Sequence, residues 1–349
     1  MLRSRPRLGA LAVILAAAPL ASAQYKITNM GFTADPGERM YMTQSGSVVQ
    51  DNHMYSNGVL STLPTFQGVS PLALGINANN LVVGTNPSAS NAHAFMYDGS
   101  MIDLGNMGGT SADATGVTDS GTIVGGYLTM PNKVTVQKGF EKVGKTVTVL
   151  KSLYGGLYDS VSVWGVTESG TAFGDSAGYN NPNINLPVIW KSATPTELPL
   201  ATGFDEGVVV GANSLGQFIV NETTASYVTD MFLYSGGALT ELPNMPGGSG
   251  AFAFNSTGEI LATGFTSKGA FESVLYKPGV GFINETSLVA SAGYTSFQGM
   301  AINDAGQIAG VAWGSNGYEG LLLTPQSVPE PTSWCILGVG ILALLRRRR

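Results

Sequence analysis

Short apolar runs separated by turn residues recur along almost the whole chain. Within residues 93–126, four such runs alternate with breaks, and the clearest break is Asp119-Ser120-Gly121. Small polar residues next to a glycine supply the backbone angles that a tight hairpin needs. Between residues 24 and 327, no apolar segment has the spacing and length of a helix. The pattern therefore predicts an all-β protein built from short hairpins.

The first hairpin of this unit occurs seven times. Its turns contain Gly46, Asn80, Gly121, Gly170, Gly216, Gly258 and Gly306, at spacings of 34 to 49 residues. A second hairpin follows each first one, and the third strand of the unit often ends in an aromatic residue such as Tyr97. Repeat three is looser, with Phe140 in its third strand and residues 145–150 as its fourth. Repeats of about 40 residues with four strands each are typical of propeller blades, so we predict a seven-bladed β-propeller.

The two ends of the repeat region complement each other. The last repeat contains predicted strands at 296–303, 306–312 and 319–324, but no fourth strand before Pro325. The segment from Tyr25 to Gly31 has the pattern of the missing strand. We therefore expect it to pair into blade seven and close the ring, which removes two sheet edges that would invite aggregation. An open β-solenoid is the alternative, but it needs capping repeats that the sequence does not show.

The repeat unit resembles the extracellular HAF repeat, whose name-giving tripeptide stands here as His93-Ala94-Phe95. The segments Asp103-Leu104-Gly105 and Ala301–Gly306 also fit that family, although other copies lack the histidine. The resemblance covers nearly all of residues 25–325. It implies a structural repeat without catalytic residues.

Residues 1–23 have the parts of a secretory signal peptide. Three arginines precede an apolar stretch from Leu8 to Leu20, and the small residues Ala21 and Ala23 stand before Gln24, as signal peptidase requires. A membrane anchor needs about 20 apolar residues, more than this stretch offers. The sequence therefore predicts export, with signal peptidase as the first partner.

The C-terminal segment, residues 328–349, also has three parts. Val328, Pro329, Glu330 and Pro331 precede the mostly apolar run from Thr332 to Leu345, and the basic residues Arg346, Arg347, Arg348 and Arg349 follow. A helix over that run is about 21 Å long, shorter than the roughly 30 Å hydrocarbon core of a membrane. The arginines are expected on the cytoplasmic side, with residues 24–327 outside.

This segment resembles the PEP-CTERM sorting signal of Gram-negative bacteria. The resemblance implies recognition of the Val328–Pro331 motif, the short membrane helix and the basic end by exosortase, a membrane protease-transferase. It also implies a protein of the cell surface or extracellular matrix that is anchored only transiently in the inner membrane. An ordinary tail anchor is the alternative.

The composition of residues 24–327, which we call the body, argues against nucleic-acid binding. Charged residues make up 11% of the chain, and seven of the 17 basic residues lie in the two terminal segments. The strongly acidic body that is left is not expected to bind nucleic acid through phosphate contacts. The only cysteine, Cys335, lies in the C-terminal segment, so the body has no disulfide bond.

Two features could carry chemistry: the two histidines could bind a metal, and one segment has the pattern of a catalytic serine. His53 and His93 stand at the start of third strands in neighbouring blades, where structural roles are favoured. The segment from Gly174 to Gly178 fits the G-x-S-x-G pattern around Ser176, but a hydrolase of that type needs a following helix and a later histidine. We therefore predict that Ser176 is not a nucleophile.

Oxygen-bearing turn residues could bind calcium, but turn chemistry alone accounts for them. They are Asn77, Asp119, Asn213, Asn255, Asn303 and Asp304. The other notable carboxylates, Asp159, Asp205 and Glu206, do not repeat between blades. We predict a non-enzymatic, exported binding or structural propeller without a cofactor, with extracellular polysaccharide as a candidate partner. A secreted propeller enzyme acting on polysaccharide or peptide, and a calcium-dependent adhesin, are the alternatives.

Overall fold

A computed structural model describes residues 24–87 and 91–326 of the chain. In these residues, 28 strands form seven antiparallel sheets of four strands each. The predicted signal peptide and the predicted membrane helix lie outside the described residues. Within the described part, no helix is long and apolar enough to span a membrane.

We number the sheets as blades 1 to 7 in chain order. Blade 1 contains β2 (Tyr41–Met42), β3 (Val48–Gln50), β4 (His53–Ser56) and β5 (Val59–Thr62). Blade 2 contains β6 (Leu72–Ile76), β7 (Val82–Thr85), β8 (Ala94–Tyr97) and β9 (Met101–Gly105). Blade 3 contains β10 (Ser111–Val117), β11 (Ile123–Thr129), β12 (Val136–Val143) and β13 (Thr146–Leu150). Blade 4 contains β14 (Ser160–Val166), β15 (Ala172–Gly178), β16 (Asn181–Lys191) and β17 (Thr194–Glu197).

Blade 5 contains β18 (Glu206–Ala212), β19 (Phe218–Thr223), β20 (Thr229–Ser235) and β21 (Ala238–Glu241). Blade 6 contains β22 (Ser249–Phe254), β23 (Ile260–Phe265), β24 (Phe271–Lys277) and β25 (Gly281–Asn284). Blade 7 contains β26 (Ser296–Ile302), β27 (Ile308–Gly314), β28 (Gly317–Gln326) and β1 (Gln24–Thr33). Three single-turn helices lie in the connections: η1 (Pro131–Lys133), α1 (Thr286–Val289) and η2 (Ala290–Ala292). They are too short for a search based on helical spacing to find.

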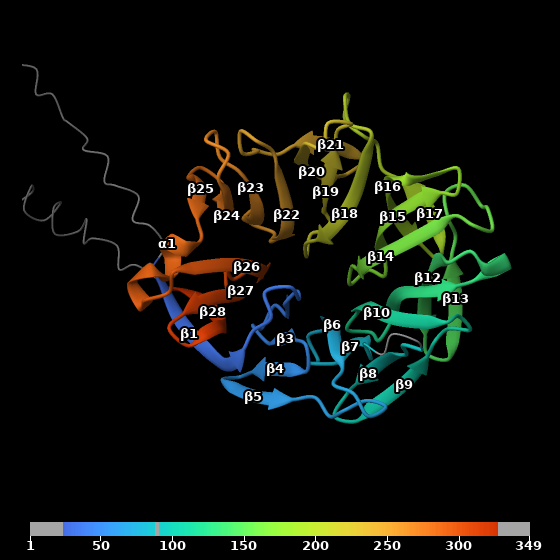
Figure 1. Cartoon of the computed structure of the whole chain (residues 1–349), viewed down its shortest axis with the longest axis horizontal. Coiled ribbons are helices and arrows are strands. Elements are labelled where there is room, and N and C mark those ends of the chain that lie inside the picture. Colours follow the sequence, from blue (N-terminus) through green and yellow to red (C-terminus); the bar gives the residue numbers. More distant parts are fainter. Residues whose placement is uncertain (1–23, 88–90, 327–349) are drawn as a thin grey trace, which may run out of the picture. The chain divides into compact units, whose positions relative to one another are not determined.

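The apolar core is divided among the junctions between blades. Seven clusters of buried apolar residues occur, and each joins two neighbouring blades, including blade 7 with blade 1. The first strand of each blade lies toward the centre of the ring, as Figure 1 shows for β6, β10, β14, β18, β22 and β26. The predicted seven-bladed propeller with four strands per blade is therefore confirmed.

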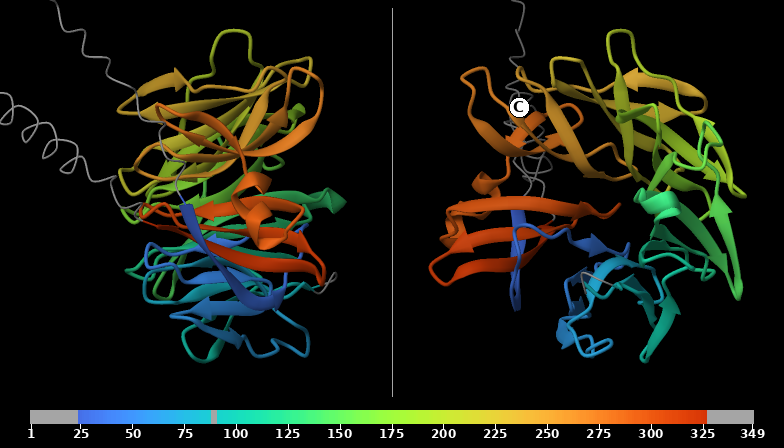
Figure 2. Two further views of the ribbon diagram at one scale, coloured as in Figure 1. Left: turned by 90° about the vertical axis from the view of Figure 1, so that its left-hand side faces the viewer. Right: turned by 45° about the vertical axis from the view of Figure 1, so that its right-hand side comes forward.

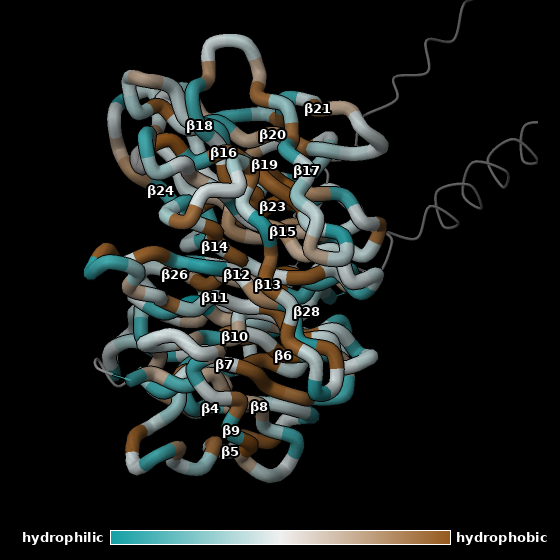
Figure 3. The backbone as a smooth tube through the Cα atoms, turned by 90° about the vertical axis from the view of Figure 1, so that its right-hand side faces the viewer, coloured by the Kyte–Doolittle hydropathy of each residue, from teal (hydrophilic) through white to brown (hydrophobic). Residues whose placement is uncertain are grey.

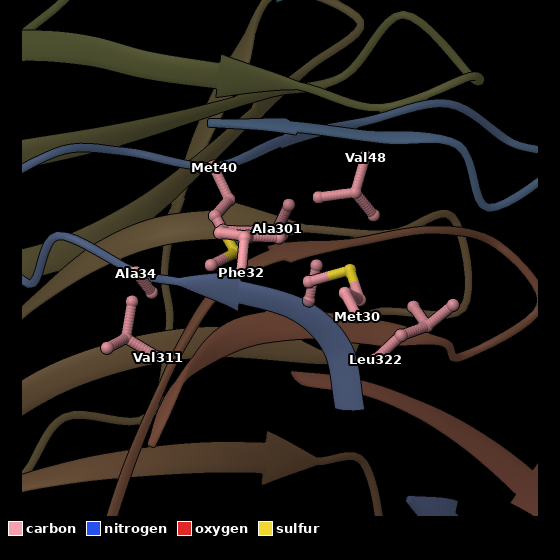
Figure 4. Packing of buried hydrophobic residues seen from close by; sticks show 9 residues of the cluster. Met30, Phe32, Ala34, Met40, Val48, Ala301, Val311 and Leu322 are labelled. Atoms are coloured by element: carbon pink, nitrogen blue, oxygen red, sulfur yellow. The ribbon is translucent and has the colours of Figure 1, made fainter. Parts of the chain in front are cut away.

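The N-terminal strand closes the ring, as predicted. Strand β1 lies beside β28, at the outer edge of blade 7 (Figures 1 and 2). Its residues Met30 and Phe32 are buried in one cluster with Met40 and Val48, which belong to blade 1 and the segment leading into it (Figure 4). A Cβ atom on Gly320 would lie 2.5 Å from the ring of Phe32, so this glycine makes room for the closing strand.

The seven predicted turn residues share one backbone conformation. All have positive φ, from +60° at Asn80 to +86° at Gly121. In each turn, the amide of this residue donates to the carbonyl three positions earlier, as from Gly121 to Thr118 at 3.0 Å. A glycine or asparagine is favoured here because other side chains rarely adopt this conformation.

A second recurring glycine has a steric cause. The first strand carries a register irregularity in blades 2 to 7. In four of these blades, a carbonyl of that strand points at the Cα of a glycine on the second strand. A Cβ atom there would lie 2.0 to 2.2 Å from the carbonyl oxygen, at Gly84, Gly125, Gly174 and Gly310. Gly174 of the G-x-S-x-G segment is therefore explained by blade geometry.

Candidate functional site

The oxygen-bearing turn residues join blades to one another. We call the residue that begins each first-hairpin turn the turn-ring residue; these residues are Thr43, Asn77, Thr118, Thr167, Asn213, Asn255 and Asn303. The amide nitrogen of Asn77 donates to the carbonyl of Thr118 in the next blade at 2.9 Å, and Asn255 does the same to Asn303 at 3.1 Å. Asn303 completes the circle by donating to the carbonyl of Gln44 at 3.2 Å.

The carboxylates beside the turn ring are used in the same way. Asp119 accepts from the backbone amide of Ala78 at 2.8 Å. Asp304 accepts from the amide of Ser256 at 2.8 Å and from the hydroxyl of Ser214 at 2.5 Å. Burial alone would raise the pKa of Asp304, but these hydrogen bonds outweigh it and lower the pKa. In the part of the chain that the structure describes, no group of three or more potential metal-ligand side chains occurs.

The two histidines occupy separate environments. His53 stacks on Phe32, with ring centroids 4.9 Å apart. His93 pairs with Asp103 through its Nδ1 atom at 3.0 Å, and Gln67 donates to the same carboxylate at 3.1 Å. Burial opposes ionisation of Asp103, but the hydrogen bonds from His93, Gly105 and Gln67 prevail and lower its pKa. The tripeptide at 93–95 thus ties the third strand of blade 2 to its fourth.

Ser176 is fully buried and held by the backbone. Its hydroxyl donates to the carbonyl of Ser160 at 3.0 Å and accepts from the amide of Leu153 at 3.3 Å. Its neighbour Gly178 lies under the ring of Tyr154, which a Cβ atom would approach to 3.1 Å. The structure does not bring Ser176 and either histidine into hydrogen-bond contact.

The isolated carboxylates have mixed roles. Asp159 is buried and accepts from the amide of Tyr179 at 3.0 Å, and Asp205 accepts from the amide of Ala225 at 2.7 Å. Asp205 and Glu206 also line a small pocket of about 150 Å³ beside Tyr227. Asp159 therefore holds a loop through its hydrogen bonds. Of the three carboxylates, Asp205 and Glu206 line the small pocket and Asp159 does not.

The larger cavity lies on blade 3 and on the connection that leads to blade 4. It measures about 420 Å³ and is lined by Tyr127, Thr129, Pro131, Lys138, Val149, Leu150, Lys151, Ser152, Gly155, Gly156 and Leu157. We call it the tyrosine groove. Lys138 donates to the carbonyls of Leu157 and Asp159, each at 2.9 Å, and so fixes the connection against the blade. Burial lowers the pKa of Lys138, and the charge of Asp159 opposes that effect.

Two further tyrosines, Tyr154 and Tyr158, belong to the connection that lines part of the groove, and Tyr179 packs on Tyr158. Tyr154 and Tyr179 are 57% and 53% exposed. The rings of Tyr158 and Tyr179 lie 4.9 Å apart, and Asn132 donates to the Tyr158 hydroxyl at 2.7 Å. The sequence pattern did not predict this site, and its one signal is that repeat three departs from the common pattern more than the other copies.

Exposed apolar side chains concentrate on this side of the propeller. Seven of the 19 large apolar side chains that are well exposed in the described residues belong to blade 3, to the connection after it or to the turn after β15; they are Met130, Val143, Val147, Val149, Tyr154, Leu157 and Tyr179. Figure 3 looks onto this side, where β12 and β13 face the viewer. Exposed apolar patches of this kind mark binding surfaces more often than the remaining surface of a soluble protein does.

Comparison with known proteins identifies one segment. Residues 327–349 match the PEP-CTERM protein-sorting motif. No curated protein matches the chain. The chain is thus an exported protein that carries a sorting signal processed by exosortase, a membrane enzyme.

Several solved structures resemble the body at low identity. One is a puromycin-hydrolyzing peptidase of Mycobacterium tuberculosis, with a TM-score of 0.48 and 12% identity over 83% of this chain and 51% of the peptidase. A fucose-specific lectin from Aleuria aurantia has a TM-score of 0.40 and 13% identity over 72% of this chain and 95% of the lectin. Trypanosoma rangeli sialidase has a TM-score of 0.38 and 11% identity over 85% of this chain and 59% of the sialidase. The chain spans about half the length of the peptidase, and these likenesses carry no argument about activity.

Proposed function

We propose that this protein is an exported, non-enzymatic binding propeller of the cell surface or extracellular matrix, and that the tyrosine groove contacts its ligand. The observation that carries the proposal is the groove itself, a cavity of about 420 Å³ whose lining connection also carries the exposed ring of Tyr154. The C-terminal sorting motif is consistent with a function outside the cell.

The chemistry of the groove favours a neutral polysaccharide. Sugar rings have apolar faces that pack on aromatic side chains, and their hydroxyl groups bond to groups such as the tyrosine hydroxyl. Tyr154 and Tyr179 offer the first kind of surface, and Tyr127 and Ser152 in the groove offer the second. Since the body is strongly acidic, a highly charged anionic polymer would be repelled at long range.

Affinity electrophoresis in gels containing a soluble β-glucan, an α-glucan or a galactan tests the proposal. We expect at least one polysaccharide to retard the wild-type protein and to retard the Tyr154→Ala/Tyr179→Ala double variant much less. Tyr227→Ala is the control, because Tyr227 is 88% exposed on blade 5, away from the groove. Equal retardation of the wild type and the double variant would show that the tyrosine groove does not bind the polysaccharide.

The enzymatic alternative has a direct test at Ser176. We expect any esterase or peptidase signal from the purified protein to be unchanged in Ser176→Ala, because the hydroxyl is buried and bonded to the backbone. General-base assistance contributes about 10²- to 10⁴-fold to a rate, so a true nucleophile would lose activity clearly. Loss of activity with an unchanged circular dichroism spectrum would favour an enzyme.

The calcium-dependent alternative is tested by calorimetric titration with Ca²⁺. The turn-ring oxygens already accept backbone amides, as Asn77 does from Asn79 and Leu81 at 3.0 Å. We therefore expect no saturable heat. A stoichiometric exothermic transition would favour an adhesin.

The sorting signal is tested on the protein recovered from outside the cell. We expect mass spectrometry to find a C-terminus near Pro331, without the apolar run or the arginines. An extracellular protein that retains Arg349 would contradict processing at this motif.

A further inference from the structure

Side chains from three separated parts of the ring meet at its centre. Arg39 lies between β1 and β2 at the entry to blade 1, Trp164 lies on β14 in blade 4, and Phe252 lies on β22 in blade 6. The guanidinium carbon is 5.3 Å from the Trp164 ring centroid and 5.9 Å from the Phe252 ring centroid. Because β14 and β22 are innermost strands of non-adjacent blades, this contact lies near the propeller axis (Figure 1). We call these three residues the axial cluster.

The blade repeat explains why the two rings converge. Trp164 and Phe252 are the residues skipped in the pairing of the first and second strands of their blades. A bulge of this kind re-aims a side chain and breaks the regular alternation between the two faces of a sheet. Leu74, Val210 and Met300 occupy the same position in blades 2, 5 and 7. Val210 and Met300 pack against the apolar clusters between blades, whereas Trp164 and Phe252 reach Arg39.

The indole of Trp164 is both fixed and open to solvent. Its Nε1 atom donates to the Oδ1 atom of Asp175 at 2.8 Å, and Asp175 is only 5% exposed. Nevertheless, 43% of Trp164 is accessible. A ligand in solvent can thus reach a ring whose orientation the protein already holds.

The guanidinium of Arg39 lacks an acidic partner. Two ion pairs occur among residues 24–87 and 91–326, and neither includes Arg39. Within the same residues its side chain makes no hydrogen bond, although a guanidinium carries five N–H donors. Burial raises the pKa of Asp113, on the first strand of blade 3, to about 6. Burial also raises the pKa of Tyr41, and the positive charge of Arg39 opposes that rise.

We propose that the axial cluster binds the carboxylate of a uronic acid. The guanidinium lies over two aromatic rings and donates no hydrogen bond within the described residues, so its N–H donors remain for a planar, bidentate acceptor such as a carboxylate. The exposed part of Trp164 provides an apolar surface for the sugar ring next to that carboxylate. The acidic body disfavours polyanions, so the site selects a sugar with a single negative charge.

This site is separate from the tyrosine groove and does not depend on the function proposed for it. The probe is glucuronate, compared with glucose at matched ionic strength and followed by calorimetry and tryptophan fluorescence on the exported protein. We expect saturable binding of glucuronate, a change in fluorescence, and at least tenfold weaker binding of glucose, since charge-assisted hydrogen bonds are lost.

Two variants assign the binding to the axial cluster. Arg39→Gln keeps a polar side chain of similar length and should lower the affinity for glucuronate at least tenfold. Trp164→Phe should keep calorimetric binding within a few-fold but lose the fluorescence change. The Tyr154→Ala/Tyr179→Ala variant should bind glucuronate like the wild type, even if it no longer binds polysaccharide.

Each other result overturns the proposal. Absence of saturable glucuronate binding to the wild type, equal affinity for glucose, or unchanged affinity in folded Arg39→Gln would each do so. If Arg39→Gln fails to fold, two measurements still test the proposal. They are the affinities of the wild type for glucuronate and glucose, and the fluorescence response of Trp164→Phe to glucuronate. A fluorescence change that persists in Trp164→Phe would place the ligand elsewhere.

Discussion

The turn ring differs between two arcs of the propeller. From blade 5 through blades 6 and 7 to blade 1, every junction is bridged by the amide of an asparagine, namely Asn213, Asn255 or Asn303. In blades 3 and 4 the same position holds Thr118 or Thr167, whose side-chain hydrogen bonds stay within their own turns. We call these the asparagine arc and the threonine arc.

The difference lies in how many polar groups one side chain carries. The hydroxyl of Thr118 accepts from the amide of Thr122 at 3.0 Å and shares a hydrogen bond with the hydroxyl of Ser120 at 2.9 Å, so both of its contacts stay within its own turn. The side-chain oxygen of Asn255 accepts from the backbone amide of Glu259 at 2.9 Å, and its amide nitrogen can still donate to the next blade. The asparagine arc includes the junction where the chain closes on itself, and the threonine arc carries the tyrosine groove and Trp164. An asparagine bridge is therefore present at the junction where a break would open the ring.

The largest expected effect comes from removing the strand that closes the asparagine arc. Deletion of residues 25–31 takes away most of β1, including Met30, and exposes the edge of β28. We expect the free energy of unfolding to fall by more than about 4 kcal/mol, or cooperative unfolding to disappear. A typical surface substitution changes this free energy by roughly 0.5 kcal/mol. Urea denaturation followed by circular dichroism measures it. A deletion variant with a wild-type midpoint would show that β1 is not needed for closure.

The asparagine arc also contains a buried acid that makes stability depend on pH. Glu285 is fully buried, accepts from the amide of Gly299 at 2.6 Å, and has a second carboxyl oxygen without a hydrogen-bond partner in the described residues. Burial raises its pKa from 4.5 to about 8, and the bond from Gly299 opposes the rise only partly. The folded state therefore favours the protonated form.

The sign of the pH effect follows from that shift. The stabilisation is complete below pH 4.5 and is lost as the pH rises to about 8, because the unfolded chain releases the proton first. Glu285→Gln cannot ionise, so we expect it to be more stable than the wild type at pH 8 by a few kcal/mol, and similar to it near pH 4. Equal denaturation midpoints for both proteins at pH 8 would mean that Glu285 is not held in a neutral form.

The sequence predicted the fold better than the sites because the fold repeats. Positive φ at residues such as Gly121 leaves a local signal, and seven copies of that signal determine the number of blades. The missing fourth strand of the last repeat likewise pointed to Tyr25–Gly31. Ring closure could thus be predicted by counting strands: the last repeat has three, and the N-terminal segment supplies the fourth. This prediction needs no knowledge of side-chain contacts.

The sites could not be predicted in the same way because they combine residues that are distant in sequence. Arg39 and Phe252 meet only because the ring brings separate blades to one axis. Tyr158 and Tyr179 come together across a loop that departs from the repeat. The amide of Asn303 has an obvious role in its own turn, and its bond to Gln44 becomes visible only once the ring is closed.

A smaller effect is expected when one junction of the asparagine arc is converted to the threonine type. Asn303→Thr keeps an oxygen for its own turn but removes the amide that donates to the carbonyl of Gln44. Asn303 is buried, and the same amide also donates to the carbonyl of buried Thr43 at 3.4 Å, so we expect a cost of about 1–3 kcal/mol. Thermal and urea denaturation measure it. Leu215→Ala, in an exposed turn position of blade 5, is the matched control and should change stability by roughly 0.5 kcal/mol or less.

The smallest expected effect is a gain from the reverse exchange in the threonine arc. Thr118→Asn would retain an acceptor for the amide of Thr122 and add an amide nitrogen directed at the carbonyl of Thr167, as Asn77 already does toward Thr118. The two turns already lie close enough for the amide of Asp119 to donate to Glu168 at 2.8 Å. A new buried hydrogen bond is worth about 0.5–1.5 kcal/mol, so the urea midpoint should rise without a change in slope. Thr118→Val is the control; it has no polar group at this position and should be less stable than the wild type. If Thr118→Asn is no more stable than the wild type, the reach of the side chain does not explain the difference between the two arcs.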